Sequence, residues 1–345
     1  MKDLIKNLIL EEGFDLVSVV SPLSLLLKSD LKSKYLTWLS SSLNAEMEYL
    51  RKSLEKKFNP LLTEEWVKSV ILVGASYFNP SRFDLPSEEY GKVAMYAWGE
   101  DYHFVIKTLL FKVVERLKKE TSKEFRYRVF SGAAPLYEKG FAVVGNLGFQ
   151  GKNTCIVHPR LGSFFFIGEI LTDIELEPDE GQLEEGCGSC SKCVTSCPTK
   201  ALRDYVLNAS VCISYFTVEY RGMIPEDIAC KMGSWTFGCD VCQEVCPFNR
   251  SLNSKATKPR IKEFSLNVTP FLNLREVMRI SSSNQFRKLF KRKAFLRAGR
   301  RGLIRNSIIT AVNNGAKSLK EEIYLLSKDT DEVISATAKW ALDNL

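Results

Sequence analysis

Hydrophobic and polar positions follow two different rhythms in the first half of the chain. Apolar residues recur at helical spacing in three segments, 2–13, 31–57 and 102–120. Strands are predicted by apolar runs rich in β-branched and aromatic residues at 67–78, 126–132 and 163–176. This half therefore predicts a mixed arrangement of helices and strands.

The second half of the chain has a different pattern. An acidic segment, 177–186, is predicted to be an exposed linker, and ten cysteines are concentrated mainly in the following residues, 187–250. The last part, 303–345, contains short amphipathic segments, which predict helical hairpins stacked on one another.

Composition limits the class of protein. The 345 residues are 45% hydrophobic and 26% charged, which is typical of a folded globular chain. We find no uncharged apolar run of about 18 residues and no secretory leader, so we expect a cytoplasmic protein without a membrane span. Because disulfides are rare in that compartment, clustered cysteines favour metal ligation. The net charge of +7 could suit a nucleic acid.

The cysteine spacing predicts two iron–sulfur clusters. The first motif, C-x2-C-x2-C-x3-C-P, comprises Cys187, Cys190, Cys193 and Cys197 and has the spacing of bacterial ferredoxins. The second motif, C-x2-C-x3-C-P, comprises Cys239, Cys242 and Cys246 and lacks one cysteine, for which Cys212 is the candidate. If the ligands cross as in two-cluster ferredoxins, each cluster takes four thiolates: Cys187, Cys190, Cys193 and Cys246 for one, and Cys197, Cys212, Cys239 and Cys242 for the other.

A pair of zinc sites is the alternative for these motifs, because zinc also binds paired cysteines. The 2-2-3 spacing before a proline favours iron–sulfur clusters. The remaining cysteines, Cys155 and Cys230, are interpreted as ordinary buried thiols.

Several segments together resemble epoxyqueuosine reductases over nearly the whole chain. They are MYAWGEDYH (95–103), LGFQGKN (147–153), GSFFFIGEILTD (162–173), CISYFTVEYRGMIPED (212–227) and GCDVCQEVCPFN (238–249). The resemblance implies an α+β fold with three parts: an α/β cobalamin and substrate domain at 1–180, a ferredoxin-like domain with two [4Fe–4S] clusters at 181–255, and basic HEAT-like helical repeats that bind tRNA at 256–345.

The resemblance also implies an activity. These enzymes use cobalamin and two [4Fe–4S] clusters to reduce the epoxide of epoxyqueuosine in tRNA, which gives queuosine. Reductive dehalogenases share the architecture. We accordingly expect epoxyqueuosine-modified tRNA as a partner, a low-potential electron donor such as flavodoxin or ferredoxin, and a monomer. The reaction also requires protons, which a carboxylic acid would supply as a general acid.

One position departs from the family pattern. The family has an aspartate three residues before the position of Pro135, and this chain has Gly132 there. No shift of one or two residues supplies a carboxylate. Glu138, on the following segment, could reach inward, whereas water or another group is the alternative proton source.

Five residues are candidates for contact with cobalamin. His103 lies in the family-like GEDYH segment, Lys152 and Asn153 close a glycine-rich loop, Lys57 stands where the family often has arginine, and Ser214 follows Cys212. Helix capping, a simple turn or a solvated surface would also account for them. His158, before a proline, is interpreted as structural.

A basic tract between 287 and 305 predicts contact with the tRNA backbone. It contains nine cations: Arg287, Lys288, Lys291, Arg292, Lys293, Arg297, Arg300, Arg301 and Arg305. Phosphate neutralisation by these cations would make RNA affinity depend on salt. The interleaved Phe286, Phe290 and Phe295 are predicted to face the core.

Three hypotheses therefore compete. The first is an epoxyqueuosine reductase, which the basic tract favours. The second is a divergent corrinoid iron–sulfur reductase with another substrate, and the third is a non-catalytic iron–sulfur electron carrier. The absence of the aspartate at Gly132 favours the last two.

Overall fold

A four-stranded antiparallel sheet forms the centre of the N-terminal lobe. The computed structural model describes residues 1–81, 83–132, 135–179, 181, 186–250, 252 and 258–345. The strand order is β1-β2-β7-β4. The strands are β1 (Leu16–Val20), β2 (Ser69–Ser76), β4 (Tyr127–Phe130) and β7 (Phe165–Thr172). The three predicted strands thus lie in one sheet, and the predicted linker at 177–186 lies partly outside the described residues.

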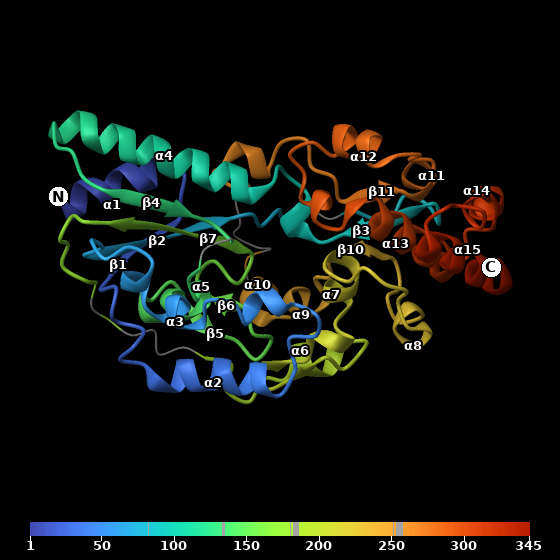
Figure 1. The fold of residues 1–345 in the computed structure, drawn as a ribbon, viewed down its shortest axis with the longest axis horizontal. Helices are drawn as coiled ribbons and strands as arrows, with labels where there is room; N and C mark the ends of the chain where they lie inside the picture. Colours follow the sequence, from blue (N-terminus) through green and yellow to red (C-terminus); the bar gives the residue numbers. More distant parts are fainter. Residues whose placement is uncertain (82, 133–134, 180, 182–185, 251, 253–257) are drawn as a thin grey trace.

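Helices cover both faces of this sheet, which explains why β2 and β7 are almost entirely buried (Figure 1). On one face pack α1 (Lys2–Glu11) and α4 (Tyr102–Thr121), in a core that includes Ile106 and Leu110. On the other face lie α3 (Leu54–Phe58) and α5 (Glu138–Val144). The predicted helices at 2–13 and 102–120 are confirmed.

The predicted helical segment 31–57 is interrupted. It contains α2 (Ser29–Ser40), the 3-10 turn η1 (Glu48–Leu50) and the start of α3. Ser42, Ala45 and Ser53 have positive φ angles, which end the helical path at each break. Arg51 holds the turn by donating to the carbonyl of Leu39. Hydrophobic periodicity does not reveal these breaks, because it does not record such contacts.

A second sheet joins all three predicted domains. Its order is β10-β3-β11, and its strands are β3 (Tyr90–Val93), β10 (Trp235–Phe237) and β11 (Phe271–Asn273). Val93 and Ala97 share a core with the C-terminal helices. The segment around β3, which the sequence interpretation assigned to the N-terminal domain, therefore packs in the C-terminal lobe.

The cysteine-rich module lies between the two lobes (Figure 1). Its short helices are α6 (Lys192–Ser196), α7 (Ile213–Val218), α8 (Glu226–Ala229), α9 (Val241–Glu244) and α10 (Pro247–Arg250). Two small hairpins complete this middle region: β5 (Phe149–Gln150) with β6 (Ile156–Val157), and β8 (Leu202–Arg203) with β9 (Val206–Leu207).

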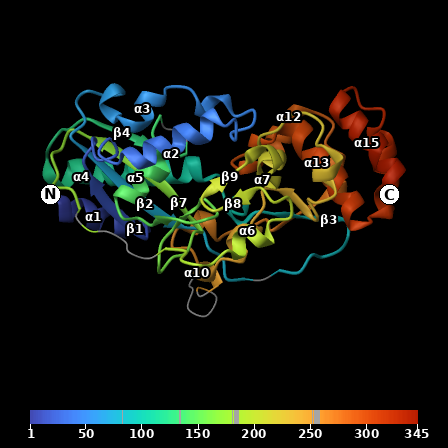
Figure 2. The ribbon, with the colours of Figure 1, turned by 90° about the horizontal axis from the view of Figure 1, so that it is seen from below.

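The chain ends in a helical lobe at the opposite end from the N-terminus (Figure 2). Its helices are α11 (Leu274–Met278), α12 (Ser283–Leu289), α13 (Gly299–Asn314), α14 (Lys320–Leu326) and α15 (Glu332–Asn344). The predicted helices after 303 are confirmed. None of the helices in the described part of the chain is both long and apolar enough to cross a membrane.

Candidate active site

Four cysteines surround one small cavity in the middle module. They are Cys187, Cys190, Cys193 and Cys246, and Gly151, Lys152 and Asn153 complete the wall. The backbone N–H of Lys152 points at the sulfur of Cys187, 3.3 Å away. N–H groups aimed at sulfur stabilise thiolates, so the donors of this cavity fit an iron–sulfur cluster.

The other four predicted ligands lie close enough for their thiols to affect one another. Burial raises the pKa values of Cys212, Cys239 and Cys242, and the neighbouring thiols raise them further. Cys197 belongs to the same group, since its charge affects both Cys212 and Cys239. The backbone N–H of Ala201 donates to the sulfur of Cys197 at 3.3 Å. The partition of the eight thiols between two clusters stays a prediction.

The two remaining cysteines differ from each other. Cys155 is partly buried, and burial raises the pKa of its thiol. Cys230 is exposed at the end of α8, so the interpretation of this residue as a buried thiol is wrong. Its neighbours Ile228 and Ala229 take the buried positions of this turn instead.

A much larger cavity, of about 1370 Å³, lies between the N-terminal lobe and the cysteine module. One wall is formed by α2 and η1, a second by Lys57 and the segment 135–139, and a third by β8, β9 and their turn. The indole N–H of Trp38 fixes two of these walls together by donating to the carbonyl of Leu207 at 2.6 Å. Small-ligand pockets typically have volumes of about 300–1000 Å³. This cavity is larger, and its volume suits a large cofactor.

Gly132 lies on the wall of this cavity, beside two aromatic rings of α4. Tyr102 and His103 stack on each other with ring centroids 4.0 Å apart. Asp101 caps the helix and holds the Nδ1 atom of His103 at 2.8 Å, which leaves Nε2 directed toward Gly132. An α4 side chain therefore occupies the space next to the position where the family has its aspartate.

Two glutamates lie near this segment: Glu138 contacts Gly132, and Glu169 lies opposite Phe130 in the sheet. Glu138 accepts a hydrogen bond from the backbone N–H of Gly132 at 2.7 Å, and burial raises its pKa to about 7. Glu169, on β7, is completely buried, and burial followed by the charge of Glu138 raises its pKa well above the usual value. Sequence reasoning missed Glu169; the signal was a lone acid inside the apolar run FFFIGEIL.

The predicted cobalamin contacts fall into two groups. Lys57 lines the large cavity, and burial lowers the pKa of its ammonium, partly offset by Glu138. His103 lies beside the cavity wall at Gly132. Lys152 and Asn153 instead line the small cysteine cavity, where Lys152 pairs with Asp204 at 2.9 Å. Ser214 adjoins Cys212 through its backbone N–H.

The structure divides the basic tract into bound and free cations. Arg305 is fully buried and donates to the carbonyls of Phe216, Tyr220 and Gly222, so it cannot contact RNA. Four arginines form ion pairs with acids: Arg292, Arg297, Arg300 and Arg301. Lys293 donates to backbone carbonyls. The prediction of nine phosphate-binding cations is therefore too broad.

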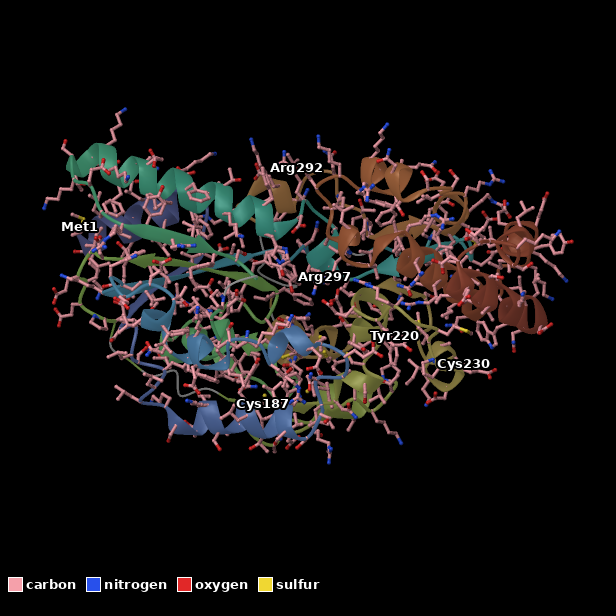
Figure 3. The ribbon with its side chains drawn as sticks, in the orientation of Figure 1. Met1, Cys187, Tyr220, Cys230, Arg292 and Arg297 are labelled. Carbon is pink, nitrogen blue, oxygen red and sulfur yellow. The ribbon has the colours of Figure 1, made fainter. Side chains whose placement is uncertain are left out.

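Three cations of the tract remain without a partner among the described residues: Arg287, Lys288 and Lys291. All three are exposed on or directly after α12. Phe286 and Phe295 are buried in the core of the C-terminal lobe, as predicted, and Phe290 packs against that core. Arg292 and Arg297 lie near the middle of the molecule, between the two lobes (Figure 3).

Comparison with protein families identifies two regions of the chain. Residues 186–249 match the model described as a 4Fe-4S double cluster binding domain. Residues 57–131 match the model described as Epoxyqueuosine reductase QueG, DUF1730. The first match decides between the two interpretations of the cysteine motifs in favour of iron–sulfur clusters over zinc.

Whole-chain relatives extend this result. An epoxyqueuosine reductase of Cyclobacterium marinum is 38% identical over 78% of this chain and 84% of its own length. One from Shewanella oneidensis is 32% identical over 90% of this chain and 81% of its own. The chain belongs to the epoxyqueuosine reductase family.

Solved structures of epoxyqueuosine reductases have the same fold. One, in complex with an epoxyqueuosine-modified stem loop of tyrosine tRNA, is 28% identical and superposes with a TM-score of 0.87 over 99% of this chain and 89% of its own. Another, from Bacillus subtilis, has its catalytic aspartate loop swung out of the active site; it is 28% identical, with a TM-score of 0.84 over 99% of this chain and 88% of its own. The predicted mixed α+β fold is confirmed.

Proposed function

We propose that this chain reduces the epoxide of epoxyqueuosine in tRNA to the alkene of queuosine. The observation that carries the proposal is the cavity of about 1370 Å³, which has Glu138 on one side and the iron–sulfur module on the other. A substrate in this cavity would have proton donors and an electron source within one site. The family relatives support the same reaction.

The cavity also fits cobalamin, the cofactor that we propose for it. Its walls combine polar side chains with apolar ones such as Leu31, Trp38 and Val206, as a corrin ring with peripheral amides would require. Lys57 and the polar groups of the β8–β9 turn would hold the amides. When bound, cobalamin would supply the low-potential two-electron chemistry of the reaction.

The residues between the cavity and the cysteines suit electron delivery. Thr154 lines the cavity, and the next residue, Cys155, lies close enough to Cys242 to affect the pKa of its thiol. The cluster held by Cys197, Cys212, Cys239 and Cys242 would therefore be the nearer one. The more distant cluster would receive electrons from a low-potential donor such as flavodoxin or ferredoxin.

The C-terminal helices would bind the tRNA. Arg287, Lys288 and Lys291 are free to neutralise phosphates. Arg297 lies over the ring of Tyr49, which lines the cavity, so the basic tract reaches the cavity at this point. We propose that α11 to α15 act as the HEAT-like repeats of the family, and that the chain works as a monomer in the cytoplasm.

A single-turnover assay tests the proposal. The chain, purified without oxygen and loaded with both clusters and cobalamin, would be mixed with a low-potential reductant and epoxyqueuosine-containing tRNA. We expect queuosine in the nucleoside digest by mass spectrometry. If fully loaded, reducible protein leaves epoxyqueuosine unchanged at every pH tried, the proposal is wrong.

Gly132 supports a second candidate function. A corrinoid reductase acting on another substrate would use the room that the missing aspartate leaves. Conversion of epoxyqueuosine at a rate that supports turnover excludes this alternative, and also excludes a non-catalytic electron carrier.

A further inference from the structure

A side chain at Gly132 would meet two rings of α4 in this structure. Its φ angle is +67°, and a Cβ atom would lie 2.6 Å from Nε2 of His103 and 2.9 Å from the hydroxyl of Tyr102. These distances are well below van der Waals contact. Side chains of α4 therefore lie where the family's aspartate side chain would begin. Because glycine has no carboxyl group, the acid that the reaction needs must come from a different residue.

The carboxylate of Glu138 reaches the same wall of the cavity. It lies in the first turn of α5, accepts the N–H of Gly132 at 2.7 Å and lines the cavity itself. The loop conformation that Gly132 permits is what turns this N–H toward the carboxylate. The loss of one acid and the positioning of another are thus two results of the same glycine.

The surroundings of Glu138 keep both of its protonation states accessible. Burial raises its pKa to about 7, while the Gly132 N–H, His103, Lys139 and Lys57 lower it. Tyr102 also lies close, and the charge of Glu138 contributes to the raised pKa of its phenol after burial. A general acid works best when its pKa is near the working pH.

Glu169 is a second acid next to Glu138. Its side chain is fully buried on the central strand β7, and neither of its carboxylate oxygens has a hydrogen-bond partner among the described residues. A buried carboxylate without partners is costly, whereas the neutral acid is tolerated. Burial, followed by the charge of Glu138, raises its pKa well above the usual value, which favours the neutral acid.

We propose that Glu138 is the catalytic acid of this chain. The inference rests on the proposed function. Reduction of an epoxide to an alkene breaks both C–O bonds and forms one C=C bond, and it consumes two electrons and two protons and releases water. The electrons come from the reduced cofactor. Glu138, which lines the cavity, protonates the leaving oxygen and takes up a proton from water there for the second transfer.

The test compares the wild-type chain with Glu138→Gln in the loaded, single-turnover reaction from pH 5.5 to 9. Glutamine still accepts the N–H of Gly132, so the loop should keep its conformation. We expect the rate to fall at least about 100-fold. The wild-type rate should decline as the pH rises through about 7, and the variant should lack this decline. Glu55→Gln, which removes an exposed carboxylate on the neighbouring α3, should match the wild type.

A second measurement does not depend on turnover. Infrared difference spectra of the full-length protein without cobalamin should show a carboxylic acid C=O band that titrates near pH 7 and is missing in Glu138→Gln. In Glu169→Gln this band should still titrate near pH 7, because the pKa of Glu138 is set by burial and by Gly132, His103, Lys139 and Lys57. A titrating band that is unchanged by Glu138→Gln would overturn the assignment.

The outcomes separate the inference from the proposed function. If the wild type makes queuosine and Glu138→Gln does so within threefold with the same pH profile, Glu138 is not the acid, although the proposed function stands. If the wild type makes no queuosine at any pH, the proposed function fails and the catalytic role of Glu138 fails with it. A large rate loss together with the altered pH profile supports the proposal.

Discussion

The chain has two concentrations of charge, and the structure treats them in opposite ways. In the C-terminal tract most of the cations have partners within the protein: backbone carbonyls hold the buried Arg305, and a carboxylate pairs with Arg300. Glu138 at the cavity and the buried Glu169, which its charge affects, have no ion pair in the described part of the chain. The difference teaches that the number of charges in a segment does not show which are available for function; their partners do.

The largest effect should come from the most deeply buried cation. Arg305→Met would leave the carbonyls of Phe216, Tyr220 and Gly222 without their donor inside the protein. We expect the free energy of unfolding to fall by about 3 kcal/mol or more, measured by urea denaturation. Arg287→Met, on the exposed face of α12, should change it by less than about 0.5 kcal/mol. Equal effects would show that burial does not distinguish the two arginines.

Substitution of the free cations should weaken tRNA binding and leave the free energy of unfolding nearly unchanged. Reversal of charge at Arg287, Lys288 and Lys291 to glutamate should weaken tRNA binding and reduce the slope of log affinity against log salt by about 2 to 3. The unfolding free energy should hardly change. The control reverses three exposed lysines of the distal helices, Lys317, Lys320 and Lys339. If the control weakens binding as much, the effect is one of net charge and not of this surface.

Gly132→Asp should destabilise the protein, because the new side chain meets Nε2 of His103. We expect a loss of roughly 1–3 kcal/mol from backbone strain and crowding together. Gly315→Asp is a matched control: its φ angle is +69°, close to that of Gly132, but no atom lies within 4 Å of its Cβ position. The difference between the two variants measures the crowding alone, and no difference would mean that His103 moves freely.

The unpaired acids should make stability depend on pH. The pKa of Glu138 is about 7 in the folded chain and 4.5 when unperturbed, so the folded state binds its proton more tightly. The stabilisation is complete below about 4.5 and is lost as the pH rises through 7. Glu138→Gln should therefore lose less stability than the wild type between pH 5 and pH 8 in urea denaturation. An identical loss in both proteins would contradict the raised pKa.

The smallest effect should come from an exposed ion pair. Arg301 pairs with Asp331 at 2.6 Å while its side chain is 48% exposed, so Arg301→Gln should cost no more than about 1 kcal/mol. Arg300 pairs with Asp329 at only 15% exposure and also donates to the carbonyl of Ile280. Arg300→Gln should therefore cost more when both variants are measured by urea denaturation, and the reverse order would show that exposure is not decisive.

The sequence by itself determined the parts of this protein whose residues lie close together in the chain. Seven of the eight predicted cluster ligands lie in two short motifs. The spacing within each motif was enough to indicate iron–sulfur clusters. Helices such as α4 and strands such as β2 and β7 were predicted because hydrophobic periodicity is a local property.

Only the tertiary structure decided which side chains have partners. Glu169 comes from the central strand of one sheet and Glu138 from a helix 31 residues earlier, and their interaction depends on how α5 packs beside β7. Strand β3 joins the C-terminal lobe for the same reason, since its partners β10 and β11 are more than a hundred residues away. Burial and pairing are set by contacts between distant segments, which no spacing along the chain records.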